Sequence, residues 1–138
     1  MISYTHQINY YETDTMGITH HSNYFRFMEE ARVYFLDKLG WSYAKMEEVG
    51  LYSPVLTVSC EYKKTTTFPD ILRIDVEVLK LKGLKMEISY KMYVGDTLVT
   101  VATSSHAFFD KNQTPVFLEK KYPELYKELQ NHLIKEES

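Results

Sequence analysis

The feature that most constrains the fold is a long segment, residues 24–39, that contains neither Gly nor Pro. On a helical wheel one face of this segment is apolar, and it carries Tyr24, Phe27, Met28, Ala31, Tyr34, Phe35 and Leu39. Phe25, Val33 and Leu36 widen that face, and the clearly polar stripe holds only Arg26, Glu30 and Asp37. We therefore predict a mostly covered helix with Ser22 or Asn23 as its N-cap and Gly40 just after its end.

A polar loop stands directly before this helix. It contains one carboxylate, Asp14, one glycine, Gly17, and two adjacent histidines, His20 and His21. Carboxylates and imidazoles exchange protons, and the first turn of a helix offers unpaired backbone N–H groups. A loop of this composition at the start of a covered helix is therefore our candidate site.

Most of the remaining chain carries strand patterns. Residues 4–10 alternate well enough for a first strand, with His6, Ile8 and Tyr10 on one face. After Gly50, four β-rich segments follow at residues 55–64, 71–81, 84–94 and 98–109. Two dipeptides predict hairpin turns between them, Lys82-Gly83 and Gly95-Asp96.

Two shorter helices complete the expected elements. Residues 42–49 predict a short helix ended by Gly50, and residues 122–135 predict a surface helix. On the second helix Leu125, Leu129 and Leu133 lie on one side. Residues 110–115 are expected to form a loop.

The order of these elements predicts the fold class. Strands joined largely by tight turns form an antiparallel meander, and the apolar face of such a sheet must be covered. The long helix is the only large apolar element available. We predict an α+β fold in which a curved antiparallel five-stranded sheet wraps around one long central helix, with residues 1–138 as a single domain.

Composition excludes several classes of function. The net charge of -3 does not suit a nucleic-acid-binding surface. One cysteine, Cys60, excludes an internal disulfide and fits a reducing compartment. No apolar run approaches the roughly 18 residues of a membrane span, and the first eleven residues lack a signal-peptide core. We expect a cytoplasmic protein without a membrane span.

The candidate loop and helix resemble a known signature. Residues Asp14-Thr15-Met16-Gly17-Ile18, then His21-Ser22-Asn23-Tyr24, and then Glu29 and Arg32 are similar to hotdog-fold acyl-CoA thioesterases. The similarity is to the 4-hydroxybenzoyl-CoA thioesterase type, including the bacterial acyl-CoA thioesterases associated with the Tol-Pal system. Ser104–Asp110 and Pro115-Val116 resemble the last strand of the family and its exit, more weakly. The order of the elements extends this resemblance over essentially the whole chain.

The resemblance implies roles for individual residues. Asp14 falls at the catalytic carboxylate of the family, and His21 falls where one branch carries a histidine. Asn23 and Tyr24 match the start of the family's helix. The chain departs from the family at Thr15, Met16, Thr19 and His20, which replace small, Pro-Ala, apolar or aromatic residues. These departures bear on which acyl group is preferred.

Thioester hydrolysis suits this set of residues. A thiolate leaves readily, so a Ser-His-Asp triad is unnecessary, and no cofactor is expected. Asp14 could act as a general base on water or as a nucleophile on the carbonyl carbon. Backbone N–H groups between Gly17 and Tyr24 would stabilise the oxyanion, and the resemblance favours the amide of His21. The imidazole of His21 could orient the thioester or the water.

Other titratable residues are assigned to lesser roles. His20 and His21 are adjacent, so an extended backbone would point them in opposite directions, which argues against a shared metal ion. No third metal ligand is evident, so His20 is assigned to structure or to the pocket rim. We expect His6, His106 and His132 to be ordinary strand or surface histidines and Cys60 to be inert. Glu29 is expected to be partly buried, more as a hydrogen-bond partner fixing the helix than as a catalyst.

The family resemblance also implies how substrate binds and how subunits assemble. Relatives bind the acyl carrier in a tunnel at the subunit interface, and the basic residues available here are Lys63, Lys64, Lys85 and Lys91. Each of these also fits a solvated strand lysine. Residues 65–67, three threonines, resemble a loop that contacts the carrier or the second subunit. A single layer of strands leaves an exposed edge, so we expect a homodimer or homotetramer.

Three alternatives to an acyl-CoA thioesterase stay open at this point. The acyl group could arrive on acyl carrier protein, or the chain could be a non-catalytic module that binds acyl thioesters. A hotdog dehydratase is a further enzymatic alternative, but its differently placed histidine and helix carboxylate are not found here. The acyl group itself cannot be read from the sequence, because Tyr, Phe and Met suit aromatic and aliphatic chains equally.

Overall fold

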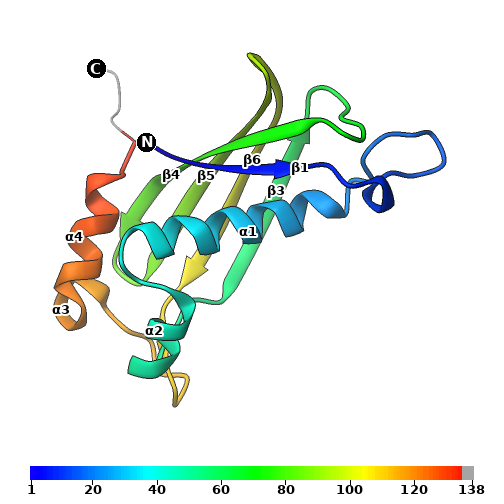
Figure 1. Cartoon of the computed structure of the whole chain (residues 1–138). Coiled ribbons are helices and arrows are strands. Elements are labelled where there is room, and N and C mark those ends of the chain that lie inside the picture. Colours follow the sequence, from blue (N-terminus) through cyan, green and yellow to red (C-terminus); the bar gives the residue numbers. More distant parts are fainter. Residues whose placement is uncertain (135–138) are drawn as a thin grey trace.

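The computed structural model describes residues 1–134. Its elements in chain order are β1 (Ile2–Gln7), η1 (Tyr10–Glu12), α1 (Asn23–Lys38), α2 (Tyr43–Val49), β2 (Leu51–Tyr52), β3 (Val55–Tyr62), β4 (Ile71–Lys82), β5 (Lys85–Val94), β6 (Thr97–Ala107), β7 (Phe109–Asp110), α3 (Leu118–Lys121) and α4 (Pro123–Asn131). Five strands form one antiparallel sheet in the order β1-β4-β5-β6-β3 (Figure 1). The fold class is therefore α+β, as predicted.

The middle of the sheet forms where the sequence alternates most clearly. In β4 the side chains of Leu72, Ile74, Val76 and Val78 are fully buried, and their neighbours in the strand face outward. Tight turns at two glycines with positive φ join β4 to β5 and β5 to β6. Alternation and turn residues therefore predicted these three strands correctly.

The position of β3 was not predicted. The strand pairs with β6 at one edge of the sheet, whereas β4, the next strand in the chain, pairs with β1 and β5. Residues 63–70 carry the chain across the sheet, and the turn at residues 67–70 does not join two paired strands, so the meander covers only β4 to β6. This edge position leaves one side of β3 without a partner strand within residues 1–134.

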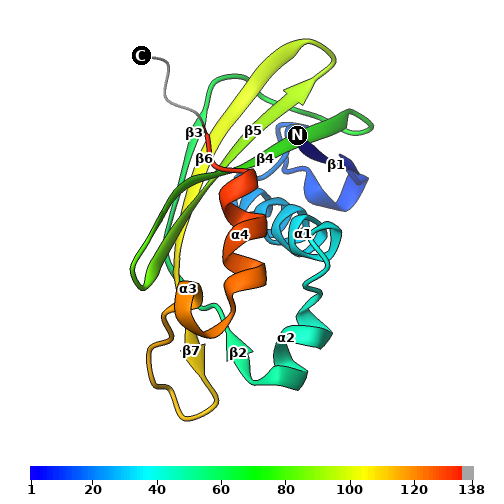
Figure 2. The ribbon, with the colours of Figure 1, turned by 90° about the vertical axis from the view of Figure 1, so that its left-hand side faces the viewer.

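The helices lie on one face of the sheet. Figure 2 shows α1 and α4 on the same side of it, with α2 below. Phe27, Ala31 and Phe35 of α1 are fully buried, and so are Leu125 and Leu129 of α4. Burying a large apolar side chain of this kind typically stabilises a fold by about 1.5–3 kcal/mol. The apolar stripe of α1 is thus buried as predicted, but several helices cover the sheet.

The helix ends confirm some expectations and correct others. Gly40 and Gly50 adopt positive φ at the ends of α1 and α2, as expected of C-terminal glycines. Ser22 does precede α1, but its backbone is helical and its side chain contacts His20 rather than a free N–H group. The predicted N-cap position, Ser22, is therefore confirmed, but its side chain makes no capping hydrogen bond.

Other boundaries also differ from the prediction. Strand β1 ends at Gln7, and Tyr10 lies in η1 with 77% of its surface exposed rather than on the buried face. Part of the expected loop at residues 110–115 belongs to β7, which pairs with β2. The predicted helix at residues 122–135 is observed as the shorter α4, Leu133 lies beyond its end and is exposed, and residue 135 lies outside the described residues. The short helix α3 before it was not predicted. Among residues 1–134, no helix has the length and apolar character needed to cross a membrane.

Candidate active site

The loop that holds Asp14 projects beyond the sheet, ahead of α1 (Figure 1). A bridge between Thr13 and Thr19 closes it. Inside, the N–H of Asp14 donates to the carbonyl of Ile18 at 2.9 Å, and the N–H of Gly17 donates to the carbonyl of Asp14 at 2.9 Å. Gly17 has φ 77, a conformation that other residues adopt only at a cost. The sequence thus folds this loop into a tight hairpin.

The carboxylate of Asp14 is fixed on one side only. Its Oδ1 atom accepts the backbone N–H of Met16 at 2.8 Å, which is an Asx turn. Within residues 1–134, the second carboxylate oxygen accepts no hydrogen bond. The residue is half-buried. One oxygen therefore holds the side chain in place while the other remains free for a ligand.

A pocket of about 300 Å³ opens beside this carboxylate. Its walls come from the loop, the first turn of α1 and the segment that ends β3. The lining residues are Asp14, Met16, Ile18, Thr19, His21, Tyr24, Tyr62, Lys63, Lys64 and Thr65. The structure thus brings Asp14, His21 and Tyr24 to one cavity.

A threonine segment braces the loop from the other side of the pocket. Thr66 is buried, and its hydroxyl shares hydrogen bonds with the hydroxyls of Thr19 at 2.7 Å and Tyr24 at 2.9 Å. Its carbonyl accepts the N–H of Thr19, and Thr67 donates to the carbonyl of Gly17 at 2.6 Å. These contacts lie within one chain. Sequence reasoning missed this role of Thr66, for which three consecutive threonines were the only signal.

One backbone N–H group, that of His21, lies without a hydrogen-bond acceptor in residues 1–134. The N–H groups of His20, Ser22, Asn23 and Tyr24 all donate hydrogen bonds, whereas that of His21 donates none to any residue in 1–134. The carbonyl of His21 accepts the N–H of Tyr24 at 3.2 Å. A free amide at the start of a helix is suited to stabilise negative charge.

Two tyrosines flank this backbone. The hydroxyl of Tyr62 donates to the carbonyl of His21 at 3.3 Å, and its ring packs against that of Tyr24 with centroids 4.9 Å apart. Burial raises the pKa of Tyr24, and burial with the neighbouring Cys60 raises the pKa of Tyr62 to about 12. Both hydroxyls are therefore neutral hydrogen-bond donors at neutral pH.

The two histidines do not point apart. The rings of His20 and His21 stack with centroids 4.3 Å apart, and both side chains are exposed. The prediction of opposite directions is wrong because residues 20–22 form a turn in which Ser22 bonds to Nδ1 of His20. In the part of the chain that is described, no group of three or more His, Cys, Asp or Glu could hold a metal ion.

Asn23 has a different role from a pocket residue. Its side-chain Nδ2 donates to the carbonyl of Glu12 at 2.9 Å, and it is buried. It does not line the pocket. Asn23 therefore ties the start of α1 to the residue that precedes the loop.

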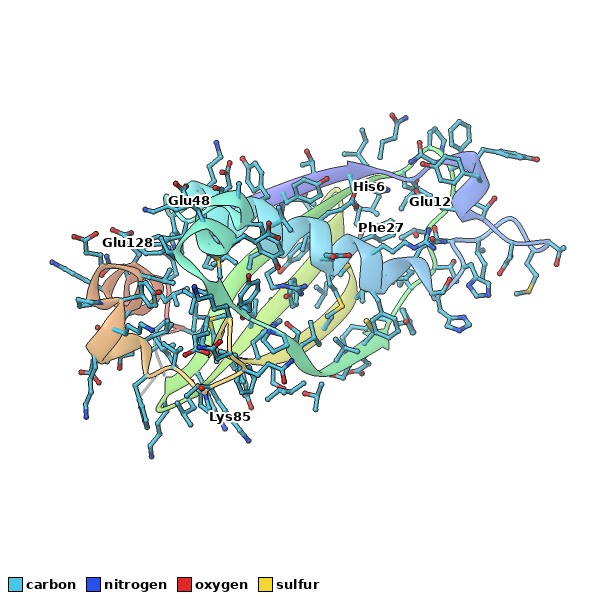
Figure 3. The ribbon with its side chains drawn as sticks, turned by 90° about the horizontal axis from the view of Figure 1, so that it is seen from below. His6, Glu12, Phe27, Glu48, Lys85 and Glu128 are labelled. Carbon is cyan, nitrogen blue, oxygen red and sulfur yellow. The ribbon has the colours of Figure 1, made fainter. Side chains whose placement is uncertain are left out.

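Several remaining candidates lie elsewhere. Glu29 is exposed rather than partly buried, and it lines a separate hollow beside Tyr43. Lys63 and Lys64 line the Asp14 pocket, but Lys85 lies at the opposite end of the molecule from Glu12 (Figure 3) and Lys91 is exposed on β5. The helical wheel predicted partial burial of Glu29 wrongly, because the buried apolar face of α1 points away from this residue.

Cys60 and His132 fit the modest roles expected of them. Burial raises the pKa of the Cys60 thiol, whose sulfur lies 3.5 Å from that of Met28. A raised pKa keeps the thiol protonated and poorly nucleophilic. His132 is half-exposed, with its ring at the edge of Phe35.

A second polar network lies in the core, away from the pocket. Arg32 of α1 donates from Nη1 to the hydroxyl of Tyr90 at 3.4 Å and from Nε to that of Tyr43 at 3.2 Å. Tyr90 shares a hydrogen bond with Ser104, which in turn contacts Nε2 of His106 at 2.7 Å. His106 is thus no ordinary strand histidine: it is fully buried, and burial, with Arg32, lowers its pKa to about 4.

Comparisons with known proteins identify the family. The thioesterase-like superfamily profile matches residues 8–133. A hypothetical protein from Aquifex aeolicus superposes with a TM-score of 0.85 at 35% identity, covering 91% of this chain and 99% of that one. A DHNA-CoA thioesterase from Staphylococcus aureus superposes with a TM-score of 0.86 at 28% identity, covering 94% and 88%. The Haemophilus influenzae acyl-CoA thioesterase YbgC is 27% identical, covering 78% of this chain and 80% of its own length. The chain therefore belongs to the thioesterase-like superfamily and is a thioester hydrolase with the hotdog fold.

Proposed function

We propose that this protein hydrolyses acyl-CoA thioesters to the free acid and CoA. The observation that carries the proposal is one pocket lined by both Asp14 and His21, of which one carboxylate oxygen and one backbone N–H have no partner among residues 1–134. The names of the Staphylococcus aureus and Haemophilus influenzae relatives describe thioesterases that act on CoA esters. We place the chain with the 4-hydroxybenzoyl-CoA thioesterase type, including its Tol-Pal-associated members, on the residues Asp14 to Tyr24.

The proposed chemistry uses two groups of the pocket, the backbone N–H of His21 and the carboxylate of Asp14. The thioester carbonyl oxygen lies near the N–H of His21, where the free donors of α1 stabilise the charge that develops in the transition state. The anchored oxygen of Asp14 keeps its carboxylate aimed into the pocket, and the free oxygen meets the water or the carbonyl carbon. Tyr24 lines this wall, Gly17 allows the turn of the loop without lining the pocket, and the imidazole of His21 orients the substrate. Glu29 is exposed outside the pocket, so we assign it no step.

Two routes follow for Asp14, and isotope labelling separates them. As a general base, Asp14 takes a proton from water, whose oxygen enters the product acid as thiolate leaves. As a nucleophile, it forms a mixed anhydride and expels the thiolate, and water then cleaves the anhydride. A single turnover in H₂¹⁸O labels the product acid by the first route. Attack of water on the Asp14 carbonyl by the second route labels Asp14 instead, which mass spectrometry detects.

Substitution of Asp14 tests the function. Asp14→Asn keeps the Asx acceptor but removes the charge, and we expect thiol release from acyl-CoA to fall by about 10² or more. A panel of aliphatic chain lengths and aryl-CoAs, followed with a thiol reagent, identifies the acyl group. Unchanged hydrolysis by Asp14→Asn would contradict the assignment. Tight binding of CoA without any turnover in the unaltered protein would instead favour a non-catalytic acyl-thioester module.

The carrier is proposed to be CoA because Lys63 and Lys64 stand at the pocket. Two adjacent cationic side chains suit the phosphates of a nucleotide carrier. Acyl carrier protein is the alternative source of the same thioester. Comparing hydrolysis of one acyl chain on the two carriers distinguishes them, with the higher kcat/KM expected for CoA.

We also propose that the chain acts as one domain and assembles as a homodimer or homotetramer. Among the described residues β3 is an edge strand, and Val55, Leu56, Val58 and Tyr62 along it are each more than two-fifths exposed. An unpaired, apolar edge invites pairing with a second copy. Light scattering after size-exclusion chromatography measures the mass, and a monomer at micromolar concentration would contradict this assembly.

A further inference from the structure

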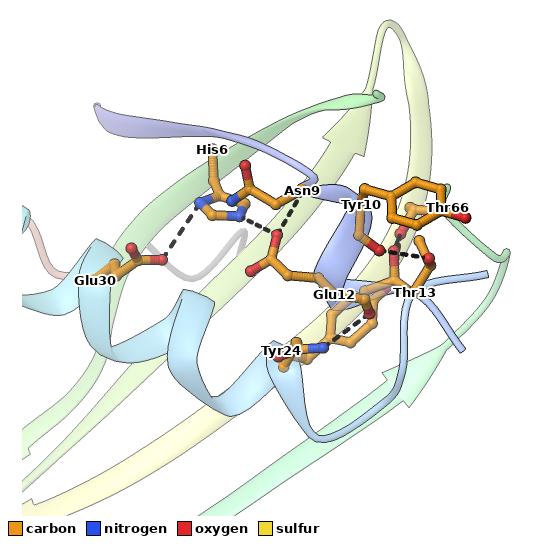
Figure 4. A network of polar contacts seen from close by, with 10 residues as sticks. His6, Asn9, Tyr10, Glu12, Thr13, Tyr24, Glu30 and Thr66 are labelled. Atoms are coloured by element: carbon orange, nitrogen blue, oxygen red, sulfur yellow. Dashed lines mark hydrogen bonds and ion pairs between the residues drawn. The ribbon is translucent and has the colours of Figure 1, made fainter. Parts of the chain in front are cut away.

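Glu12 is a buried carboxylate that lies outside the pocket, at the start of the Asp14 loop. Only 6% of its surface is exposed. A buried carboxylate is costly unless it is paired and hydrogen-bonded. Figure 4 shows His6 of β1 and Asn9, the N-cap of η1, meeting at this carboxylate.

The side chain of Glu12 is held from two directions. Its Oε1 atom accepts the backbone N–H of Asn9 at 2.7 Å and lies in hydrogen-bond contact with Nε2 of His6 at 2.9 Å. The other ring nitrogen of His6 lies 3.4 Å from Glu30 of α1, and the His6 ring packs on Phe27 with centroids 4.3 Å apart. The carboxylate thus joins β1 to the start of η1, and His6 links it onward to α1.

The backbone of Glu12 holds both ends of the catalytic loop together. Its carbonyl accepts the N–H of His20 at 2.8 Å and the side-chain Nδ2 of Asn23 at 2.9 Å. Asp14 lies two residues after Glu12, and His21 lies directly after His20. One peptide carbonyl therefore fixes where the loop leaves η1 and where it enters α1.

We propose that Glu12 is a positioning residue for hydrolysis, because its anchored carboxylate fixes the carbonyl that clamps the Asp14 loop to the start of α1. This inference rests on the roles proposed for Asp14 and His21. The two groups come from opposite ends of the loop, so their separation depends on the clamp. A displacement of about 1 Å between reacting groups can cost about 10² in rate.

The test compares isosteric substitutions of Glu12 and Glu30, the two carboxylates that contact His6. Glu12→Gln keeps the shape but removes the negative charge of the buried carboxylate beside His6, and we expect kcat to fall at least about tenfold while KM changes less than about threefold. Glu30→Gln is the matched control: it alters the other carboxylate beside His6 in the same way but touches neither end of the loop. We expect its kcat to stay within about twofold of the unaltered protein.

Asn23→Ala removes the side-chain hydrogen bond to the Glu12 carbonyl and so tests the same link between the loop and α1. If Glu12 and Asn23 act through one link, the double variant loses no more kcat than the worse single variant. Additive losses would contradict a shared clamp. Asn23→Ala also keeps the proposal testable if Glu12→Gln does not fold.

Amide hydrogen exchange gives a readout that needs no activity. We expect the N–H of His20 to exchange at least about tenfold faster in Glu12→Gln than in Glu30→Gln. Only the first variant loosens the Glu12 carbonyl, which accepts the hydrogen bond from His20. An unaltered protein without thioesterase activity overturns the proposed function but leaves this measurement valid. Equal kcat in Glu12→Gln and the unaltered protein, or equal exchange at His20 in the two variants, would overturn the positioning role.

Discussion

Two polar regions lie along α1, and they differ in what they leave unpaired. At the start of the helix, Asp14 and His21 are solvent-accessible, and each keeps one group without a protein partner in residues 1–134. Farther along, Arg32, Tyr90 and Ser104 are buried and bond to one another in a chain. Groups kept free at a pocket can act on a ligand, whereas groups satisfied in the core hold the elements together.

The buried region also contains a histidine, His106, that resists protonation. Burial and the nearby charge of Arg32 keep the pKa of His106 at about 4, below its usual 6.5. Its Nδ1 atom is buried without a hydrogen-bond partner among the described residues. The folded protein therefore holds His106 neutral at every pH at which the pocket chemistry is expected to run.

The first consequence is a pH-dependent stability that belongs to the core. Because the pKa of His106 is lower in the folded protein, its penalty is absent above pH 6.5 and grows as the pH falls toward 4. Between pH 7 and 4 this residue should remove roughly 3 kcal/mol from the free energy of unfolding. Urea unfolding at several pH values measures it. His106→Gln should lack that component, and the same pH slope in both proteins would refute it.

The next largest effect on stability is expected from removing one hydroxyl of the buried hydrogen-bond network. Tyr90→Phe leaves Arg32 and Ser104 each without one partner in a buried setting. We expect a loss of about 1–3 kcal/mol in the free energy of unfolding, with kcat within about threefold of normal. Chemical denaturation and a thioesterase assay on the same sample check both halves. A large loss of kcat with unchanged stability would contradict the separation of the two regions.

The smallest expected effect lies at the rim of the pocket. Lys63→Ala with Lys64→Ala should raise KM for acyl-CoA about three- to tenfold, because exposed charges contribute little to binding each. The free energy of unfolding should stay within about 0.5 kcal/mol. Steady-state kinetics at low and high salt measure the effect, which added salt should reduce. Lys85→Ala, at the far end of the molecule, is the control and should leave KM unchanged.

Local patterns in the sequence predicted the parts that depend on neighbours along the chain. The buried face of α1, the alternation in β4 and the glycine turns all follow from periodicity and backbone preference. The Asp14 loop was located because its residues lie close together in sequence. The Asx turn at Asp14 uses one carboxylate oxygen, and the catalytic role proposed for this residue uses the other.

The parts that sequence reasoning missed depend on contacts between distant residues. Thr66 meets Thr19, 47 positions away, and Arg32 meets Tyr90, 58 positions away. No periodicity reports such pairs, since each residue looks like an ordinary polar position in its own segment. Glu12 also lies in no distinctive local pattern, although its burial and its bond to Asn9 make it structural. The edge position of β3 was missed for the same reason.

The most direct test is to measure activity and stability side by side in Asp14→Asn and Tyr90→Phe. Asp14→Asn should lose about 10² or more in kcat and keep its free energy of unfolding within about 1 kcal/mol. Tyr90→Phe should show the opposite pattern. If Asp14→Asn retains its activity, or if both variants lose activity and stability together, the division between a reactive pocket and a structural core is wrong.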